Sequence, residues 1–209
     1  MTVETLPVGY LGTNCYIVHD GKAAVVIDPG DDVEKILETV RGLSLSVKYI
    51  FLTHAHFDHT LAAAGTAEMT GAVICAASGE FARLSDPVLS GSESFPFAKF
   101  IPLSVEFELS EKTSLKVGEL SFEFIETPGH TEGSICIVCG DTIFAGDTLF
   151  YGSCGRCDLP GGNFEDMMKS LKKLYELPGD FKVLPGHGEA TTLSRERRYN
   201  PYMAEAVRN

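Results

Sequence analysis

The sequence predicts one α+β domain, in which strands and helices alternate in the first half and strands pair as hairpins in the second. The chain has 209 residues and 44% of them are hydrophobic, which is enough for one sizeable core. Up to about residue 76, short β-rich apolar runs alternate with segments of helical periodicity, a pattern typical of parallel βαβ units. After residue 114, two-residue turns separate the apolar runs. We therefore expect a single domain over residues 1–209.

The first half begins with strands and continues as βαβ units. Asp32 precedes a segment with apolar residues at helical spacing, so we expect it to cap that helix, which Gly42 ends. Residues 78–84 are a further candidate helix, and 85–104 read as a long irregular loop of the kind that often covers a site. The other expected elements are strands over 14–18, 23–27, 48–52 and 72–76, with helices over 33–41 and from the end of the histidine motif to about Gly71.

The second half is predicted to contain mainly antiparallel strands, then a glycine-rich loop and an amphipathic helix. Met167, Leu171 and Leu174 recur on one side of that helix. The expected elements are strands over 114–117, 120–126, 134–139, 142–145 and 181–184, a loop over 148–162, a helix over 164–176 and a helical tail from about Ser194.

Composition excludes several classes of function. The 29 acidic and 17 basic residues give a net charge of −12, which repels phosphate backbones and argues against nucleic-acid or anionic-membrane partners. No stretch approaches the ~20 apolar residues of a membrane span. The first residues lack the pattern of a signal peptide, so we expect a cytoplasmic protein, a monomer or small homo-oligomer, that acts on a small molecule.

The six cysteines raise the question of a zinc ribbon, because two C-x-x-C pairs occur. Cys136 and Cys139 lie in a predicted strand, where residues three apart face opposite ways, so one ion cannot readily take both thiols. We expect them to be small core residues. Cys154 and Cys157 lie in the glycine-rich loop, where they are either a redox pair or a variation near a pocket.

The stretch Thr53-His-Ala-His-Phe-Asp-His-Thr60 carries the chemistry. Three imidazoles and a carboxylate fall within six positions at the end of an apolar strand, which is typical of a metal site. His54 and His56 face the same way in an extended segment, whereas Asp58 and His59 follow after the chain has begun to turn. This geometry favours two adjacent metal sites.

Three further residues stand where later strands end: His130 and His187 after glycines, and Asp147 after Gly146. Polar groups at such positions gather at one edge of a sheet. A first metal would then take His54, His56 and His130, and a second would take Asp58, His59 and His187. Asp147 can bridge the two ions, since one carboxylate offers two oxygens. Histidine and carboxylate ligands suit zinc, and also iron or manganese.

Six segments resemble the metallo-β-lactamase fold superfamily and, within it, a short subgroup similar to glyoxalase II (hydroxyacylglutathione hydrolase). They are Thr53–His59, Thr127–Ser134, Ala145–Phe150, Gly155-Arg156, Leu159–Asn163 and Leu184–Gly188. The resemblance implies an αββα sandwich: two mixed β-sheets packed face to face with helices on both outer sides. It implies the seven metal ligands named above, with Asp58 and Asp147 also catalytic, and it places Asp28 behind the ligands, where it orients the motif loop.

The resemblance also implies the chemistry. Two ions ~3.5–4 Å apart can share a hydroxide, which attacks at neutral pH without a serine or cysteine nucleophile. Related β-lactamases often carry a cysteine where this chain has Asp147, so the sequence favours thioesters such as S-lactoylglutathione, or lactones, over β-lactams. Arg156 matches a basic position that meets glutathione in the family. Asp158 and Glu189 replace aromatic residues expected near that site.

Three alternatives stay open at this point. A persulfide dioxygenase with a single iron would use two histidines and one aspartate, without His56. A lactonase would share the two-metal site. A non-enzymatic metal or redox module would use Cys154 and Cys157.

Overall fold

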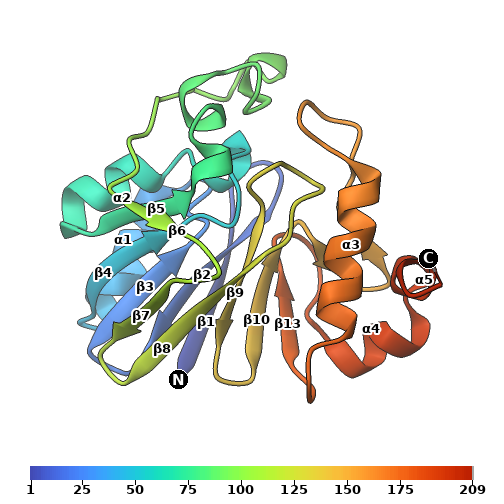
Figure 1. Ribbon diagram of the computed structural model, residues 1–209. Coiled ribbons are helices and arrows are strands. Elements are labelled where there is room, and N and C mark those ends of the chain that lie inside the picture. The colour runs from blue at the N-terminus through green and yellow to red at the C-terminus, as the bar shows by residue number, and fades with distance from the viewer. Residues whose placement is uncertain (209) are drawn as a thin grey trace.

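Two six-stranded sheets pack face to face in the computed structural model, which describes residues 1–208, and helices cover both outer sides (Figure 1). The strand order is β1-β2-β3-β4-β5-β6 in the first sheet and β14-β13-β10-β9-β8-β7 in the second. Each sheet mixes parallel and antiparallel pairs. The predicted αββα sandwich is confirmed.

The first sheet begins with an antiparallel meander and continues with parallel strands, as the βαβ pattern predicted. Ile27 pairs with Phe51, and Phe51 with Cys75, so three neighbouring strands end at the same edge. The strands of this sheet are β1 (Thr2–Val8), β2 (Thr13–His19), β3 (Ala23–Ile27), β4 (Ser46–Phe51), β5 (Val73–Ala77) and β6 (Phe107–Leu109).

The second sheet is mostly antiparallel, but β10 and β13 run parallel and pair Gly146 with Pro185. This pairing brings Asp147 and His187, which follow those ends, to one edge. The strands of this sheet are β7 (Ser114–Val117), β8 (Leu120–Glu126), β9 (Ile135–Cys139), β10 (Thr142–Gly146), β13 (Lys182–Pro185) and β14 (Thr191–Thr192), and a separate hairpin joins β11 (Leu149–Phe150) to β12 (Ser153–Cys154).

Three apolar layers hold the sandwich together. In the central layer Phe51 of the first sheet meets Phe122 and Phe124 of the second edge-to-face, with ring centroids 5.3 Å apart in both pairs. The outer layers bury α1 (Val33–Gly42) and α2 (Ala63–Thr70) on the first sheet, and α3 (Phe164–Tyr175), α4 (Leu193–Tyr199) and α5 (Pro201–Ala206) on the second. Cys136 packs in an outer layer and Cys139 in the central layer, which confirms that they face opposite ways.

Two local predictions are wrong. Asp32 stands at the start of α1 but does not cap it, because its left-handed backbone (φ 56°) turns the carboxylate to accept the Gly9 N–H at 3.0 Å. Residues 78–84 form two 3₁₀ turns, Ser78–Glu80 and Arg83–Ser85, instead of a helix. Tertiary hydrogen bonds outweighed the local preference at both places.

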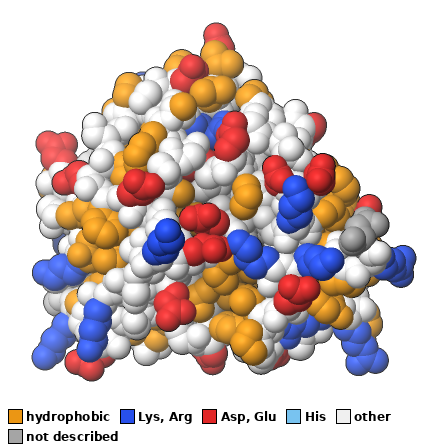
Figure 2. Space-filling view, viewed as in Figure 1, with side chains coloured by type: hydrophobic (Ala, Val, Ile, Leu, Met, Phe, Trp, Pro, Cys, Tyr) orange, Lys and Arg blue, Asp and Glu red, His pale blue; other side chains and the backbone are white. Residues whose placement is uncertain are grey.

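The segment 85–104 is irregular, as predicted, apart from a 3₁₀ turn at Ser92–Ser94. It stands above the strand ends at the top of Figure 1, beside the loops that precede β9 and α3. Acidic and basic side chains are interspersed over the face shown in Figure 2. Over residues 1–208, no helix is long and apolar enough to cross a membrane.

Candidate metal centre

The histidine motif lies where β4 ends at the upper edge of the first sheet. His56 is still extended (φ −66°, ψ 147°), and a 3₁₀ turn, Phe57–His59, then reverses the chain. His54 and His56 meet His130 from the loop before β9, with one nitrogen of each imidazole within 4.8 Å of the others. His56 Nδ1 lies 2.8 Å from His130 Nε2. We call these three residues the histidine triad.

The 3₁₀ turn directs the rest of the motif to a second group. Asp58, His59 and His187 also lie within 4.8 Å of one another. His187 Nε2 is 3.1 Å from the Asp58 carboxylate and 3.3 Å from His59 Nε2. We call these residues the mixed triad. The predicted division of the motif between two groups is therefore present in the structure.

Asp147 lies between the two triads. Its Oδ2 is 3.6 Å from His130 Nε2 and 3.8 Å from His187 Nε2, and its Oδ1 is 3.6 Å from His59 Nε2. One carboxylate thus reaches members of both triads, which is the position that a bridging ligand needs.

Two donor atoms at this centre are buried without a hydrogen-bond partner. They are His54 Nε2 and Asp147 Oδ1. His54 Nδ1 lies 3.1 Å from Thr53 Oγ1, which leaves Nε2 as the nitrogen free for an ion. An unpartnered buried polar atom is costly, so native proteins rarely keep one without a ligand. Nitrogen and carboxylate donors so arranged fit divalent metal ions.

Asp28 holds the motif from behind. Its carboxylate accepts hydrogen bonds from the Thr53 N–H at 2.8 Å and the Thr53 hydroxyl at 2.6 Å, and it lies 3.0 Å from His59 Nδ1. The last contact directs His59 Nε2 toward the mixed triad. Carboxylates behind metal-binding histidines fix ring orientation in this way. Asp28 has a left-handed backbone (φ 50°), which aims the carboxylate under the motif.

Residues of β2 position the mixed triad. The Thr13 hydroxyl donates to Asp58 at 3.0 Å. Asn14 Nδ2 donates to the carbonyls of Pro185 and Gly188, at 3.0 and 3.1 Å, and so ties both ends of the segment that carries His187. The Tyr16 hydroxyl donates to Pro185 as well, at 2.6 Å. Thr13 was not among the residues predicted to serve the site.

Sequence reasoning also missed Glu80, which is fully buried beside the histidine triad. Its carboxylate accepts from the Ala55 N–H at 2.7 Å, the Thr131 hydroxyl at 2.6 Å and the Gly133 N–H at 2.9 Å. It therefore joins the His54–His56 segment to the loop that carries His130. Arg83 Nε lies 3.2 Å away and compensates the buried charge. No motif marks Glu80, because its partners come from segments 25 and 51–53 residues away.

The triads differ in proton affinity. Burial, with the other histidines, holds the pKa of His54 well below its usual value and lowers that of His56 to about 2. Burial also disfavours a charge on His59, but the carboxylates of Asp58, Asp147 and Asp28 outweigh it and raise its pKa to about 10. The pKa of His187 is raised too, since its hydrogen bond to Asp58 and the charge of Asp147 outweigh burial.

A cavity of about 300 Å³ opens over both triads. Its walls include Leu11, Phe57, Phe95 and Leu159. Arg156 also lines it, but its guanidinium is bound by Asp158 in a bidentate pair, with nitrogen–oxygen distances of 2.6 and 2.8 Å. The Arg156 carbonyl accepts from His130 Nδ1 at 2.7 Å, so the backbone of this residue orients a triad member.

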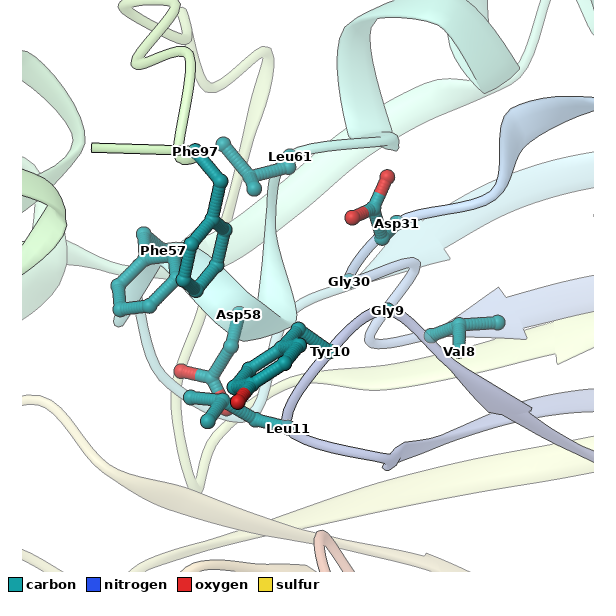
Figure 3. A pocket seen from close by; sticks show the side chains of 10 residues that line it. All are labelled: Val8, Gly9, Tyr10, Leu11, Gly30, Asp31, Phe57, Asp58, Leu61 and Phe97. Carbon is teal, nitrogen blue, oxygen red and sulfur yellow. The ribbon is translucent and has the colours of Figure 1, made fainter. Parts of the chain in front are cut away.

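A second, smaller pocket lies on the far side of Asp58 (Figure 3). Its free volume of about 10 Å³ holds about one water molecule. It is too small for a substrate. The cavity over the triads is the candidate site because the clustered metal-binding side chains line it.

Cys154 and Cys157 lie in the loop beside this cavity and are partly buried. Burial is the main cause that raises the pKa of Cys154 to about 12 and also raises that of Cys157, so both thiols stay protonated at neutral pH. Within residues 1–208, no cluster that could hold a metal includes a cysteine.

Known proteins share this architecture. The sequence profile of the metallo-beta-lactamase superfamily matches residues 8–187. The "Hydroxyacylglutathione hydrolase GloC" of Haemophilus influenzae is 32% identical, over 97% of this chain and 98% of that protein. The crystal structure of the BLEG-1 B3 metallo-beta-lactamase gives a TM-score of 0.89 at 34% identity, covering 97% of this chain and 99% of that one. The crystal structure of TTHA1623 in a di-iron-bound form gives a TM-score of 0.87 at 37% identity, covering 96% of this chain and 100% of that one.

Proposed function

The chain belongs to the metallo-beta-lactamase superfamily, and on this premise we propose that it is a hydrolase with two divalent metal ions that cleaves a thioester such as S-lactoylglutathione. The observation that carries the proposal is the placement of Asp147 between two triads whose donor atoms include buried, unpartnered ones. A single metal would leave half of these donors unused.

The residues divide by role. The histidine triad would hold one ion, the mixed triad the other, and Asp147 both. Zinc suits these donors best, and iron or manganese would accept the same donors. Such ions lower the pKa of water and polarise a carbonyl group. Asp28 keeps His59 Nε2 turned toward the other members of the mixed triad. The Arg156 carbonyl accepts from His130 Nδ1 and so keeps His130 Nε2 turned toward the histidine triad. Asp58 and Asp147 are the two carboxylates that line the cavity over the triads, and they are the ones that we propose to act in catalysis.

The relatives support this reading in part. One is named as a hydroxyacylglutathione hydrolase, which acts on a thioester, and a solved relative carries two irons. Another is named as a β-lactamase, so β-lactams belong in any substrate panel. The six free cysteines fit a reducing compartment such as the cytoplasm.

Hydrolysis of defined substrates tests the proposal. Water adds to the thioester carbonyl carbon, the C–S bond breaks, and a carboxylic acid and a thiol leave. We expect zinc-loaded protein to cleave S-lactoylglutathione or a neutral thioester, while chelator-treated protein does not. The rates of hydrolysis of a panel of thioesters, lactones and a β-lactam identify the class of substrate. Lack of thioester cleavage above the metal-free control would contradict the proposal.

A mononuclear iron dioxygenase acting on a persulfide is the second candidate. His54, His59 and Asp147 form a group of two histidines and one carboxylate within 4.8 Å, the donor set typical of such iron sites. Oxygen uptake with glutathione persulfide, together with one iron per chain, would favour this reaction. Thioester cleavage without oxygen uptake would exclude it.

A further inference from the structure

The walls of the cavity suggest which thioester it accepts. From them we infer that the site prefers thioesters with an apolar acyl arm and an uncharged thiol arm, and that Asp158 sets this preference by occupying Arg156. This inference rests on the proposed function and refines it. It concerns two regions of the cavity, one apolar and one charged.

The apolar region consists of Leu11, Phe57 and Phe95, which we call the apolar wall. Phe57 and Phe95 pack with ring centroids 4.8 Å apart, and Phe97 lies 5.5 Å behind Phe95. Figure 3 shows Leu11 and Tyr10 beside the Asp58 carboxylate, with the rings of Phe57 and Phe97 next to them. Tyr10 lies 5.1 Å from Phe97, which joins the turn after β1 to the 85–104 segment.

The apolar wall has the chemistry of an acyl site. Leu11 is 40% exposed and Phe95 is half-buried, so both offer apolar area to a bound chain while their neighbours hold them in place. A bound acyl chain that covers this area removes apolar surface from water, which favours binding. The wall adjoins the mixed triad, since Phe57 immediately precedes Asp58. An acyl chain extending from the reacting carbonyl over Asp58 would lie along it.

The charged region lies next to His130, whose Nδ1 is 2.7 Å from the Arg156 carbonyl oxygen. Arg156 is the one arginine among the residues that line this cavity, and no lysine lines it. Asp158 meets its guanidinium through two parallel N–H···O bonds, the geometry in which a substrate carboxylate would bind. The same bonds hold the pKa of Asp158 at about 2, so the aspartate stays ionised at neutral pH. The pair therefore presents no net charge to a substrate.

The consequence is selection against anionic thiol arms. A glutathionyl group carries two carboxylates, and one reaching Arg156 must displace Asp158 and approach an acidic neighbour. A neutral thiol arm needs no such displacement. The overall charge of −12 acts in the same direction, because it disfavours the approach of anions.

Three thioesters separate the two effects: S-lactoylglutathione, S-lactoyl-N-acetylcysteamine and S-hexanoyl-N-acetylcysteamine. The first two differ in the charge of the thiol arm, and the last two in the apolarity of the acyl arm. Each kcat/KM is divided by the rate of hydroxide-catalysed hydrolysis to remove intrinsic reactivity. We expect the corrected values to rise in the order given. A highest value for S-lactoylglutathione would overturn the inference.

Variants assign the effects to residues. We expect Asp158→Asn to raise the glutathione-to-neutral ratio of kcat/KM about three- to fivefold, the size of an exposed ion pair released in water. Asp166→Asn removes the same charge from an exposed ion pair on α3 and should leave the ratio as it is. We expect Phe95→Ala to lower the hexanoyl-to-lactoyl ratio about tenfold through lost apolar contact. An unchanged ratio in Asp158→Asn would contradict the role of Asp158.

Binding of uncleavable analogues keeps this test independent of catalysis. S-hexylglutathione and S-hexyl-N-acetylcysteamine are thioethers that cannot be hydrolysed, so calorimetry on the metal-loaded protein measures their binding without turnover. The inference is supported if the unaltered chain binds the neutral thioether more tightly and if Asp158→Asn reverses or reduces this difference in affinity. This holds even if no thioester is turned over. Tighter binding of S-hexylglutathione by the unaltered chain would reject it, whatever the enzyme hydrolyses.

Discussion

The histidine triad and the mixed triad are neighbours in space but opposites in electrostatics. His54 and His56 are neutral, and each keeps a buried nitrogen without a partner. In the mixed triad His59 and His187 favour protonation, because Asp58 lies against both. The first triad is therefore ready for a cation at neutral pH, whereas the second holds a proton that a metal must displace.

Different residues hold each triad in place through hydrogen bonds. Glu80 ties the histidine triad together, while Asp28 and Thr13 serve the mixed triad. The Asp147 carboxylate reaches members of both triads. Substitutions at these residues should therefore separate the two halves of the site.

The largest effect is expected from Asp147→Ala, because this change removes the carboxylate that would bind the ions of both triads. We predict a fall in kcat/KM of at least about 10²–10³-fold, the range for losing one group that stabilises developing charge. Steady-state kinetics at saturating zinc measure it. Asp141→Ala, at the exposed turn before β10, is the matched control and should retain activity. Activity within tenfold of the unaltered enzyme in Asp147→Ala would refute the bridging role.

Glu80→Gln should act on the histidine triad through stability. The amide cannot accept all the bonds of the carboxylate, and it removes the buried one of the two carboxylates that pair with Arg83, leaving only the exposed Glu132. We predict a loss of about 3 kcal/mol in the free energy of unfolding, as for other broken buried pairs. Urea unfolding of metal-free protein measures it, and a loss below about 1 kcal/mol would show that Glu80 is not a junction of this kind.

Asp28→Asn should act on the mixed triad through metal affinity. Asparagine can still accept from Thr53 but no longer supplies the charge beside His59. We predict that the second ion binds about 10–100-fold more weakly, with the first ion little changed. Competition against a chromophoric chelator measures both constants. An equal loss of metal affinity at both triads would contradict the proposal that Asp28 supports only the mixed triad.

Stability of the metal-free protein should depend on pH in two opposite ways. The lowered pKa values of His54 and His56 stabilise the fold above about pH 6.5, and this contribution is lost as pH falls. The raised pKa of His59, about 10, stabilises the fold below about pH 6.5 and is lost as pH rises toward 10.

Together the two trends give the metal-free protein its greatest stability near neutral pH. We predict that the melting temperature of chelator-treated protein falls by about 5 °C between pH 6.5 and 8.5. Metal-loaded protein should show a flatter profile, because the ion takes the place of the proton. Thermal unfolding with and without chelator, at constant ionic strength, measures both curves. A steady rise of the metal-free curve across this range would contradict the charge difference between the triads.

The residues that sequence reasoning could place were those with a local signature. The H-x-H-x-D-H string, the Gly-His dipeptides at 130 and 187, and Asp147 all follow strand ends, and parallel pairing brings such ends together. The alternation of strands with helices predicted the parallel strands β3, β4 and β5 for the same reason, whereas the sandwich was implied by the family resemblance. Periodicity and turn chemistry are local, so they can be read from one chain.

The residues that could not be predicted depend on distant partners. Glu80 lies in an ordinary Ser-Gly-Glu stretch, and only the folded chain brings Ala55 and Thr131 to it. Asp32 had a sound local reason to cap α1, but the Gly9 N–H from the turn after β1 competed for its carboxylate. Nothing local to Arg156 fixes whether its guanidinium faces a substrate or Asp158.

The number of bound metal ions in His187→Ala, compared with the unaltered protein, decides whether the two triads hold separate ions. We predict two zinc ions per unaltered chain. In His187→Ala we predict one tightly bound ion, whose X-ray absorption spectrum shows mainly nitrogen ligands from the histidine triad. Two tightly bound ions in His187→Ala, or a single ion in the unaltered protein, would contradict the two-triad centre.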